Sequence, residues 1–177
     1  MPVKNAESVY AVRYGRWTQW LRRHPRGCSL LRAVNTGLTF VFYGAYGALL
    51  VWVLIGQQSP LRAACLVVVP AVAFVLVSWY RRHFDAPRPY ECCSIEPLVS
   101  RDGAGRSFPS RHAFSAFTIA TCWFAASAPL AGLLLVAAAA LACCRVLGGV
   151  HFPRDVVAGA VIGVIAGMAA CLAYRLL

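Results

Sequence analysis

Between residues 81 and 155 the chain concentrates arginine together with histidine and aspartate at fixed spacings. The candidate site residues, in chain order, are Arg81, Arg88, Ser110, Arg111, His112, Arg145, His151 and Asp155. Arginine presents a planar fork of donors that matches phosphate oxygens, and several converging arginines repel one another unless an anion lies between them. One histidine can attack phosphorus, a second can protonate the leaving oxygen, and a nearby aspartate can fix the tautomer of the first. The pattern therefore predicts a site for phosphoryl transfer.

The elements that position these residues are predicted to be membrane helices. Of the 177 residues, 60% are hydrophobic and 13% are charged, and the mean hydropathy is +0.64. A soluble domain has about 45–50% apolar and about 25% charged residues, so the composition excludes a soluble globular chain and a disordered one. Five apolar runs approach the length of about 20 residues that crosses a bilayer, at 34–55, 61–80, 113–128, 129–147 and 156–176.

These runs are continuous rather than alternating, which favours helices over a membrane barrel. We therefore expect an all-α fold, a multi-pass bundle of about five transmembrane helices. Ser110 precedes the third run and is predicted to cap that helix, whose first N–H groups could then hold phosphate oxygens. The eight cysteines fall mostly within the predicted spans, where cysteine behaves as a small apolar residue.

Residues 1–30 form a separate predicted segment, followed by a single membrane domain over 31–177. Tyr10, Tyr14, Trp17 and Leu21 recur at spacings of four, three and four, which places them on one helix face, while arginines occupy the others. This pattern is typical of an amphipathic helix lying in the headgroup region of a membrane. The alternative is a cytosolic leader that packs on the protein.

The net charge of +11 is distributed very unevenly across the predicted membrane. Fifteen of the seventeen lysines and arginines lie on the side that holds the N-terminus and the loops around 81–112 and 145–155, and only Arg62 and Arg175 lie on the other. The positive-inside rule therefore favours a multi-pass protein of the cell membrane with a cytoplasmic site. Removing the four site arginines from the count still leaves eleven against two, although an extracytoplasmic site stays open. The cations flank spans rather than forming a basic domain, so nucleic acid is not an expected partner.

The three clusters resemble the signature of the type 2 phosphatidic acid phosphatase family, which includes membrane lipid phosphatases, glucose-6-phosphatase-like enzymes and vanadium haloperoxidases. Its pattern is lysine, six residues and Arg-Pro; then Pro-Ser-Gly-His; then Ser-Arg, five residues, histidine, three residues and aspartate. The spacing agrees throughout, but Arg81 replaces the usual lysine, Arg111 the usual glycine and Cys144 the usual serine. These departures bear on substrate preference rather than on activity.

The resemblance implies a role for each candidate residue. His151 would be the nucleophile that forms a phosphohistidine, Asp155 would orient it, and His112 would be the general acid. The residues expected to bind phosphate are Arg81, Arg88, Ser110, Arg111 and Arg145. The family needs no metal, and we expect no cofactor.

The predicted function is that of an integral membrane lipid phosphatase. Its substrate would be a lipid phosphomonoester or pyrophosphate of the phosphatidic acid, phosphatidylglycerophosphate or polyprenyl (pyro)phosphate type. One alternative is an undecaprenyl pyrophosphate phosphatase of cell-wall carrier recycling with its site outside the membrane, and another is a non-catalytic lipid-binding membrane protein. The expected partners are the lipid substrate and the bilayer. The chain would be a monomer or a homodimer, and the stripe of Gly159, Gly163 and Gly167 favours helix packing within one chain over a dimer.

Overall fold

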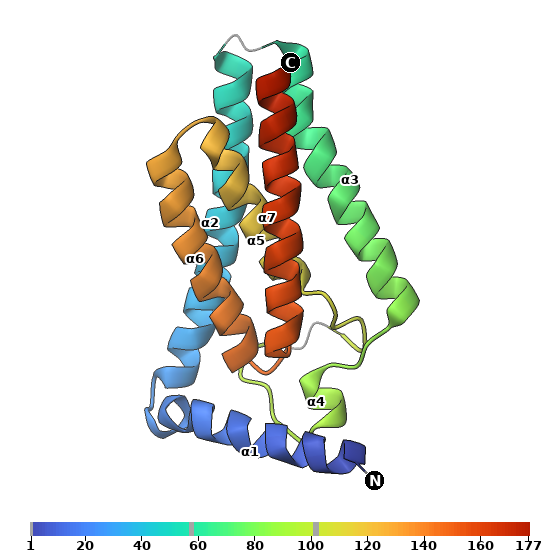
Figure 1. The fold of residues 1–177 in the computed structure, drawn as a ribbon. Helices are drawn as coiled ribbons and strands as arrows, with labels where there is room; N and C mark the ends of the chain where they lie inside the picture. The colour runs from blue at the N-terminus through green and yellow to red at the C-terminus, as the bar shows by residue number, and fades with distance from the viewer. Residues whose placement is uncertain (1, 57–58, 101–102) are drawn as a thin grey trace.

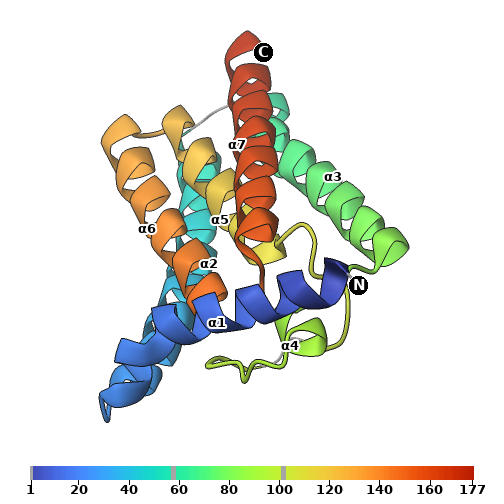
Figure 2. The same ribbon diagram turned by 60° about the horizontal axis from the view of Figure 1, so that its bottom comes forward.

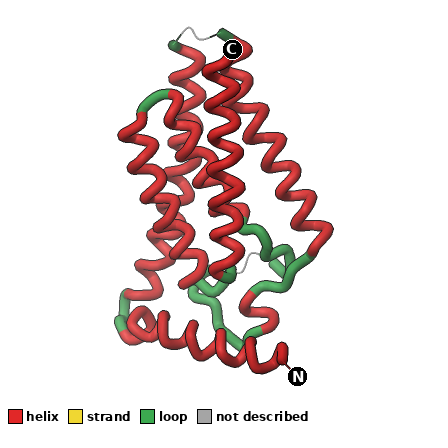
Figure 3. Tube along the Cα trace, viewed as in Figure 1, coloured by secondary structure: helices red, strands yellow, loops and turns green. Residues whose placement is uncertain are grey.

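The structure is a computed structural model that describes residues 2–56, 59–100 and 103–177. Over these ranges the chain forms helices joined by turns and loops, without a strand (Figure 3). The helices are α1 (Pro2–Arg23), α2 (Gly27–Ile55), α3 (Pro60–Phe84), α4 (Pro89–Cys92), α5 (Arg111–Cys122), the 3-10 turn η1 (Trp123–Ala125), α6 (Ala128–Leu147) and α7 (Pro153–Leu176). The predicted all-α membrane bundle is confirmed.

Four helices of the described chain are long and apolar enough to cross a membrane, namely α2, α3, α6 and α7 (Figure 1). The third predicted run, 113–128, is instead the 12-residue α5 followed by η1. A helix of 12 residues rises only about 18 Å, and η1 continues it toward the start of α6, at the end of the bundle away from Arg145. Because α5 packs against all four long helices, it lies at the centre of the bundle rather than facing lipid.

The glycine stripe of α7 lets α5 approach it closely. A Cβ atom on Gly159 would lie 2.5 Å from the carbonyl oxygen of Ser110, and one on Gly163 would lie 2.5 Å from that of Phe114. Small residues at such positions allow backbone contact between membrane helices. The stripe therefore packs two helices of one chain, and it fixes α7 relative to the start of α5.

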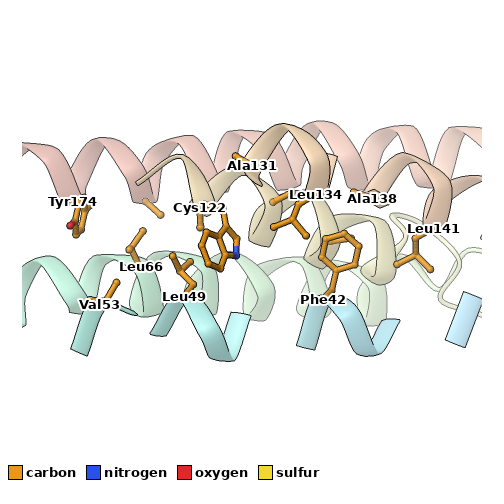
Figure 4. Packing of buried hydrophobic residues seen from close by; sticks show 14 residues of the cluster. Phe42, Leu49, Val53, Leu66, Cys122, Ala131, Leu134, Ala138, Leu141 and Tyr174 are labelled. Atoms are coloured by element: carbon orange, nitrogen blue, oxygen red, sulfur yellow. The ribbon is translucent and has the colours of Figure 1, made fainter. Parts of the chain in front are cut away.

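Apolar side chains divide into a packed interior and an exposed outer surface. The core lies between α2, α5 and α6, where Phe42, Leu49 and Leu134 are at most 5% exposed (Figure 4). On α7, Val161 and Ile165 face outward and are 53% and 62% exposed. An apolar outer surface of this kind is stable in hydrocarbon and not in water, which agrees with a membrane protein.

Helix α1 lies across one end of the bundle, below the ends of α6 and α7 (Figure 2). Tyr14 is buried, and its hydroxyl donates to the backbone carbonyl of Leu147 at 3.1 Å. The ring of Tyr10 packs edge-on against Phe152, with centroids 4.8 Å apart. Part of the predicted aromatic face thus contacts the protein, as the packed alternative expects, while Trp17 is 45% exposed. Contact of α1 with headgroups stays a prediction.

Candidate active site

The candidate residues meet at the end of the bundle that α1 covers. Arg81 lies in the last turn of α3 and Arg145 in the last turn of α6, while His151 lies in the loop before α7. Arg88 is the N-cap residue directly before α4, and Asp155 lies in the first turn of α7. These five side chains are buried, with exposures between 0% and 4%. The folding of four separate helices therefore concentrates charge in one small volume.

The buried arginines are held in place by loop carbonyls. Nη1 of Arg81 donates to the carbonyl oxygen of Ser107 at 3.1 Å and to that of Pro109. Arg88 donates from Nε to the carbonyl oxygen of Gly105 at 2.9 Å and from Nη1 to that of Val150 at 3.4 Å. These bonds fix the orientation of the guanidinium groups but do not neutralise them.

Asp155 is the only buried carboxylate among the described residues, against three buried arginines. Burying an uncompensated charge is costly, and an excess of buried cations is the electrostatic signature of an anion-binding site. Arg88 lies close enough to both His112 and His151 for its charge to lower the pKa of each. The positive groups and the two histidines therefore share one centre, as the sequence predicts.

His151 and Asp155 face one another across the start of α7. His151 Nδ1 lies 3.6 Å from Asp155 Oδ2, and the backbone N–H of Phe152 donates to the same oxygen at 3.0 Å. Ser107 adds its hydroxyl, which donates to Asp155 Oδ2 at 2.5 Å and lies 3.3 Å from His151 Nδ1. The pKa of His151 is lowered to about 4, mainly by burial and also by the charges of Arg145 and Arg88, against the opposing effect of Asp155. The imidazole is therefore neutral at pH 7, as a nucleophile must be.

Ser110 caps α5 as predicted. Its side chain accepts a hydrogen bond from the backbone N–H of Ala113 at 3.5 Å, and its own N–H donates to the carbonyl oxygen of Asp155 at 2.9 Å. This second bond ties the start of α5 to the start of α7. It places the first turn of α5, which carries His112, next to the His151 loop.

His112 and Arg111 line a cavity of about 280 Å³ whose remaining wall is largely apolar. His112 is half-buried and Arg111 is exposed, so both reach an accessible rim rather than the buried centre. Burial lowers the pKa of His112, and the charges of Arg111, Arg88 and Arg81 lower it further. A bound anion would offset those charges and restore the ability of His112 to hold a proton.

Two positions differ from what the sequence suggests. Ser107 carries no spacing signal in the sequence, because it is an isolated serine in a polar loop, yet it is 1% exposed and contacts both His151 and Asp155. Cys144 packs in an apolar cluster with Leu98 and Val150. The usual serine at that position is therefore replaced by a side chain that serves packing.

Fold and site together define a class of protein, a helical membrane bundle with a buried cationic and histidine-containing centre at one end. The chain belongs to the PAP2 superfamily, whose family model matches residues 61–176. The family predicted from the spacing of the motifs is thereby confirmed.

Two relatives illustrate the similarity. The bacitracin transport permease protein BcrC of Bacillus licheniformis is 27% identical over 129 residues, which cover 72% of this chain and 63% of that protein. The chain thus spans less than two thirds of the length of this relative. The crystal structure of LpxE from Aquifex aeolicus superposes with a TM-score of 0.67 at 30% identity, over 84% of this chain and 87% of LpxE.

Proposed function

We propose that this chain is an integral membrane lipid phosphatase that works through a phosphohistidine on His151. The observation that carries the proposal is the buried pair of His151 and Asp155 beside three buried arginines at one end of a membrane bundle. Membership of the PAP2 superfamily supports it. Phosphoryl transfer depends mainly on positioning and on stabilising charge, and this arrangement supplies both.

The reaction proceeds in two displacements at phosphorus. The Nε2 lone pair of His151 forms the N–P bond while the bond from phosphorus to the leaving oxygen breaks, and His112 donates a proton to that oxygen. His112 then accepts a proton from water, whose oxygen displaces His151 and releases inorganic phosphate. The arginines at 81, 88 and 145 hold the non-bridging oxygens throughout.

The charge stabilisation that many phosphatases take from Mg²⁺ is assigned to arginine here. Among the described residues, no group of three or more histidines, cysteines, aspartates or glutamates is arranged to hold a metal ion. Guanidinium groups bind phosphate oxygens in a fixed geometry and remain charged at all relevant pH values. We therefore expect turnover in the presence of a chelator.

The cavity beside His112 offers apolar walls to the lipid part of a substrate. Its walls include Phe42 of α2, Phe74 of α3 and Leu141 of α6, so an apolar chain leaving from His112 would pass between transmembrane helices. A water-soluble phosphate ester would gain nothing from these contacts. This wall supports a lipid leaving group rather than a sugar.

Arg111 favours a substrate with a second phosphate. Its guanidinium lies outside the buried centre but lines the same cavity as His112, where the leaving group passes. In a lipid diphosphate the leaving oxygen belongs to a phosphate, and a cation at this position would bind it. This observation supports a polyprenyl pyrophosphate as the substrate, whichever side of the membrane the site faces. Replacing Arg111 with glycine should lower the preference for lipid diphosphate over lipid monophosphate by about 10- to 100-fold.

The distribution of charge supports a proposal for the side of the membrane on which the site lies. The N-terminus and both charged loops occur at the same end of the bundle, while Arg62 and Arg175 belong to helix segments near the other end (Figure 1). The positive-inside rule favours a cytoplasmic site. A cysteine introduced at residue 8 should therefore resist an impermeant thiol reagent in intact cells, and labelling would place the site outside.

The direct test is phosphate release by the detergent-purified protein with chelator present. The substrates would be phosphatidic acid, phosphatidylglycerophosphate and undecaprenyl pyrophosphate. Release from at least one, lost in His151→Ala but retained in His83→Ala, supports the proposal, since His83 is exposed and outside the site. Folded protein that releases phosphate from none of the lipids would favour a non-catalytic lipid-binding role.

A further inference from the structure

The link between Asp155 and His151 passes through a third side chain. The distance of 3.6 Å between His151 Nδ1 and Asp155 Oδ2 is too long for a hydrogen bond. Ser107 Oγ lies 3.3 Å from the nitrogen and 2.5 Å from the oxygen. All three side chains are at most 2% exposed, so bulk water does not compete for these contacts.

The hydrogen-bonding capacities of the three groups allow one arrangement of protons. An ionised carboxylate only accepts, so the single proton of the Ser107 hydroxyl is donated to Asp155 Oδ2. The serine oxygen then has only lone pairs to offer His151, whose Nδ1 must carry a hydrogen and donate it. The neutral imidazole is thereby held with its free lone pair on Nε2.

We infer that Ser107 is a positioning residue that transmits the charge of Asp155 to His151 and fixes the tautomer of the nucleophile. Its backbone is anchored on both sides, because its N–H donates to the carbonyl oxygen of Ala86 at 2.9 Å and its carbonyl oxygen accepts from Arg81. The same residue therefore orders the phosphate-binding arginine and the histidine. A side chain held in this way needs no rearrangement when the reaction begins.

The consequence for the reaction rests on the function proposed above. When Nε2 bonds to phosphorus, the ring becomes an imidazolium whose positive charge is shared with the Nδ1–H group. The Ser107 oxygen accepts a hydrogen bond from that N–H, while the Ser107 hydroxyl donates one to the carboxylate of Asp155. This relay, the two hydrogen bonds that link His151 to Asp155 through Ser107, becomes stronger as positive charge develops on the ring. No proton leaves Nδ1, and Asp155 remains ionised, in keeping with the role of aspartate in other triads.

The relay predicts a particular pattern in steady-state kinetics. Ser107→Ala removes one oxygen atom and keeps both backbone bonds, so we expect kcat to fall about 10- to 100-fold with KM within about twofold of wild type. Ser107→Cys keeps a weak hydrogen-bond donor, so its kcat should lie between that of the wild type and that of Ser107→Ala. Because Ser107 acts through Asp155, adding Ser107→Ala to Asp155→Asn should lower kcat by less than a further threefold. Full multiplication of the two losses would overturn the inference.

A measurement without substrate separates this inference from the proposed function. Nitrogen-15 chemical shifts of the histidines, with His151 assigned by its loss in His151→Gln, report which ring nitrogen carries the proton. We expect the Nδ1–H tautomer of His151 in the wild type and a mixture of tautomers in Ser107→Ala. An unchanged tautomer in Ser107→Ala would overturn the relay whether or not the protein hydrolyses lipids. The protein could instead release no phosphate and still show the expected change from the Nδ1–H tautomer to a mixture in Ser107→Ala. That result would support the relay and would refute only the proposed function.

Discussion

Replacing Gly149 with alanine should distort the loop that carries His151, because two features of the backbone require glycine there. Its φ is +76°, a left-handed conformation that costs an L-residue about 1–2 kcal/mol. An added Cβ would also lie 2.7 Å from the Tyr14 hydroxyl oxygen and 3.2 Å from the Cα atom of Pro97. Displacing Tyr14 would break its 3.1 Å bond to Leu147, at a further cost of about 0.5–1.5 kcal/mol.

The expected loss of stability for Gly149→Ala is therefore about 1.5–3.5 kcal/mol. In a Tyr14→Phe background the hydroxyl and its bond are already absent, so the same change should cost only the backbone part, about 1–2 kcal/mol. Unfolding free energies of the four proteins in detergent micelles complete the cycle. Gly132→Ala is the matched control, because nothing lies within 4 Å of its added Cβ and helical alanine is favoured over glycine.

The catalytic effect should exceed what unfolding alone explains. Gly149 is two residues from His151, and a displacement of about 1 Å at a nucleophile can cost about 100-fold in rate. We expect kcat of folded Gly149→Ala to fall at least about tenfold, while Gly132→Ala retains wild-type turnover. Equal costs of Gly149→Ala with and without the Tyr14 hydroxyl would refute the packing of α1 on this loop.

Three further predictions concern pH, helix packing and phosphate geometry. The pKa of His151 is 6.5 in the unfolded chain and about 4 in the folded protein. Neutral His151 therefore contributes about 3 kcal/mol to the free energy of unfolding above pH 6.5, and this contribution is lost as the pH falls toward 4. The difference between the pH-dependent unfolding free energies of the wild type and His151→Gln should isolate it. Gly163→Ala places a Cβ 2.5 Å from the carbonyl oxygen of Phe114, so it should lower the free energy of unfolding by about 1–3 kcal/mol, whereas Gly47→Ala, with open space around it, should not. Arg145→Lys keeps the charge but loses the fork, and should lower kcat/KM at least about tenfold; wild-type kinetics would argue against a bidentate contact.

Hydropathy and motif spacing predicted most of the fold and most of the residues that the structure brings together at the candidate site. The long apolar runs became α2, α3, α6 and α7, because helices are the stable way to cross a bilayer. The spacing of Arg145, His151 and Asp155 placed them at a helix end, in a loop and at the next helix start, so that all three meet. These features follow from local periodicity, which a sequence displays directly.

Features that depend on the folded arrangement were not predictable in this way. The run over 113–128 is apolar enough for a span, but apolarity does not distinguish a lipid-facing helix from one buried among others, and α5 is the latter. Ser107 gained its contacts from a loop that folds back on α7, 44 residues from His151 along the chain. The contact of Tyr14 with Leu147 joins residues 133 apart. None of these leaves a periodic signal.

The measurement that tests the central claim most directly is capture of the covalent intermediate. The wild-type protein would be mixed with a substrate lipid labelled with phosphorus-32 in its terminal phosphate, quenched in base within milliseconds and analysed by mass spectrometry. The account predicts a phosphoryl group on His151 that is stable in base and released in acid, that forms at least as fast as turnover and that is absent from His151→Ala. Turnover with the label on another residue, or undiminished turnover by His151→Ala, would contradict it.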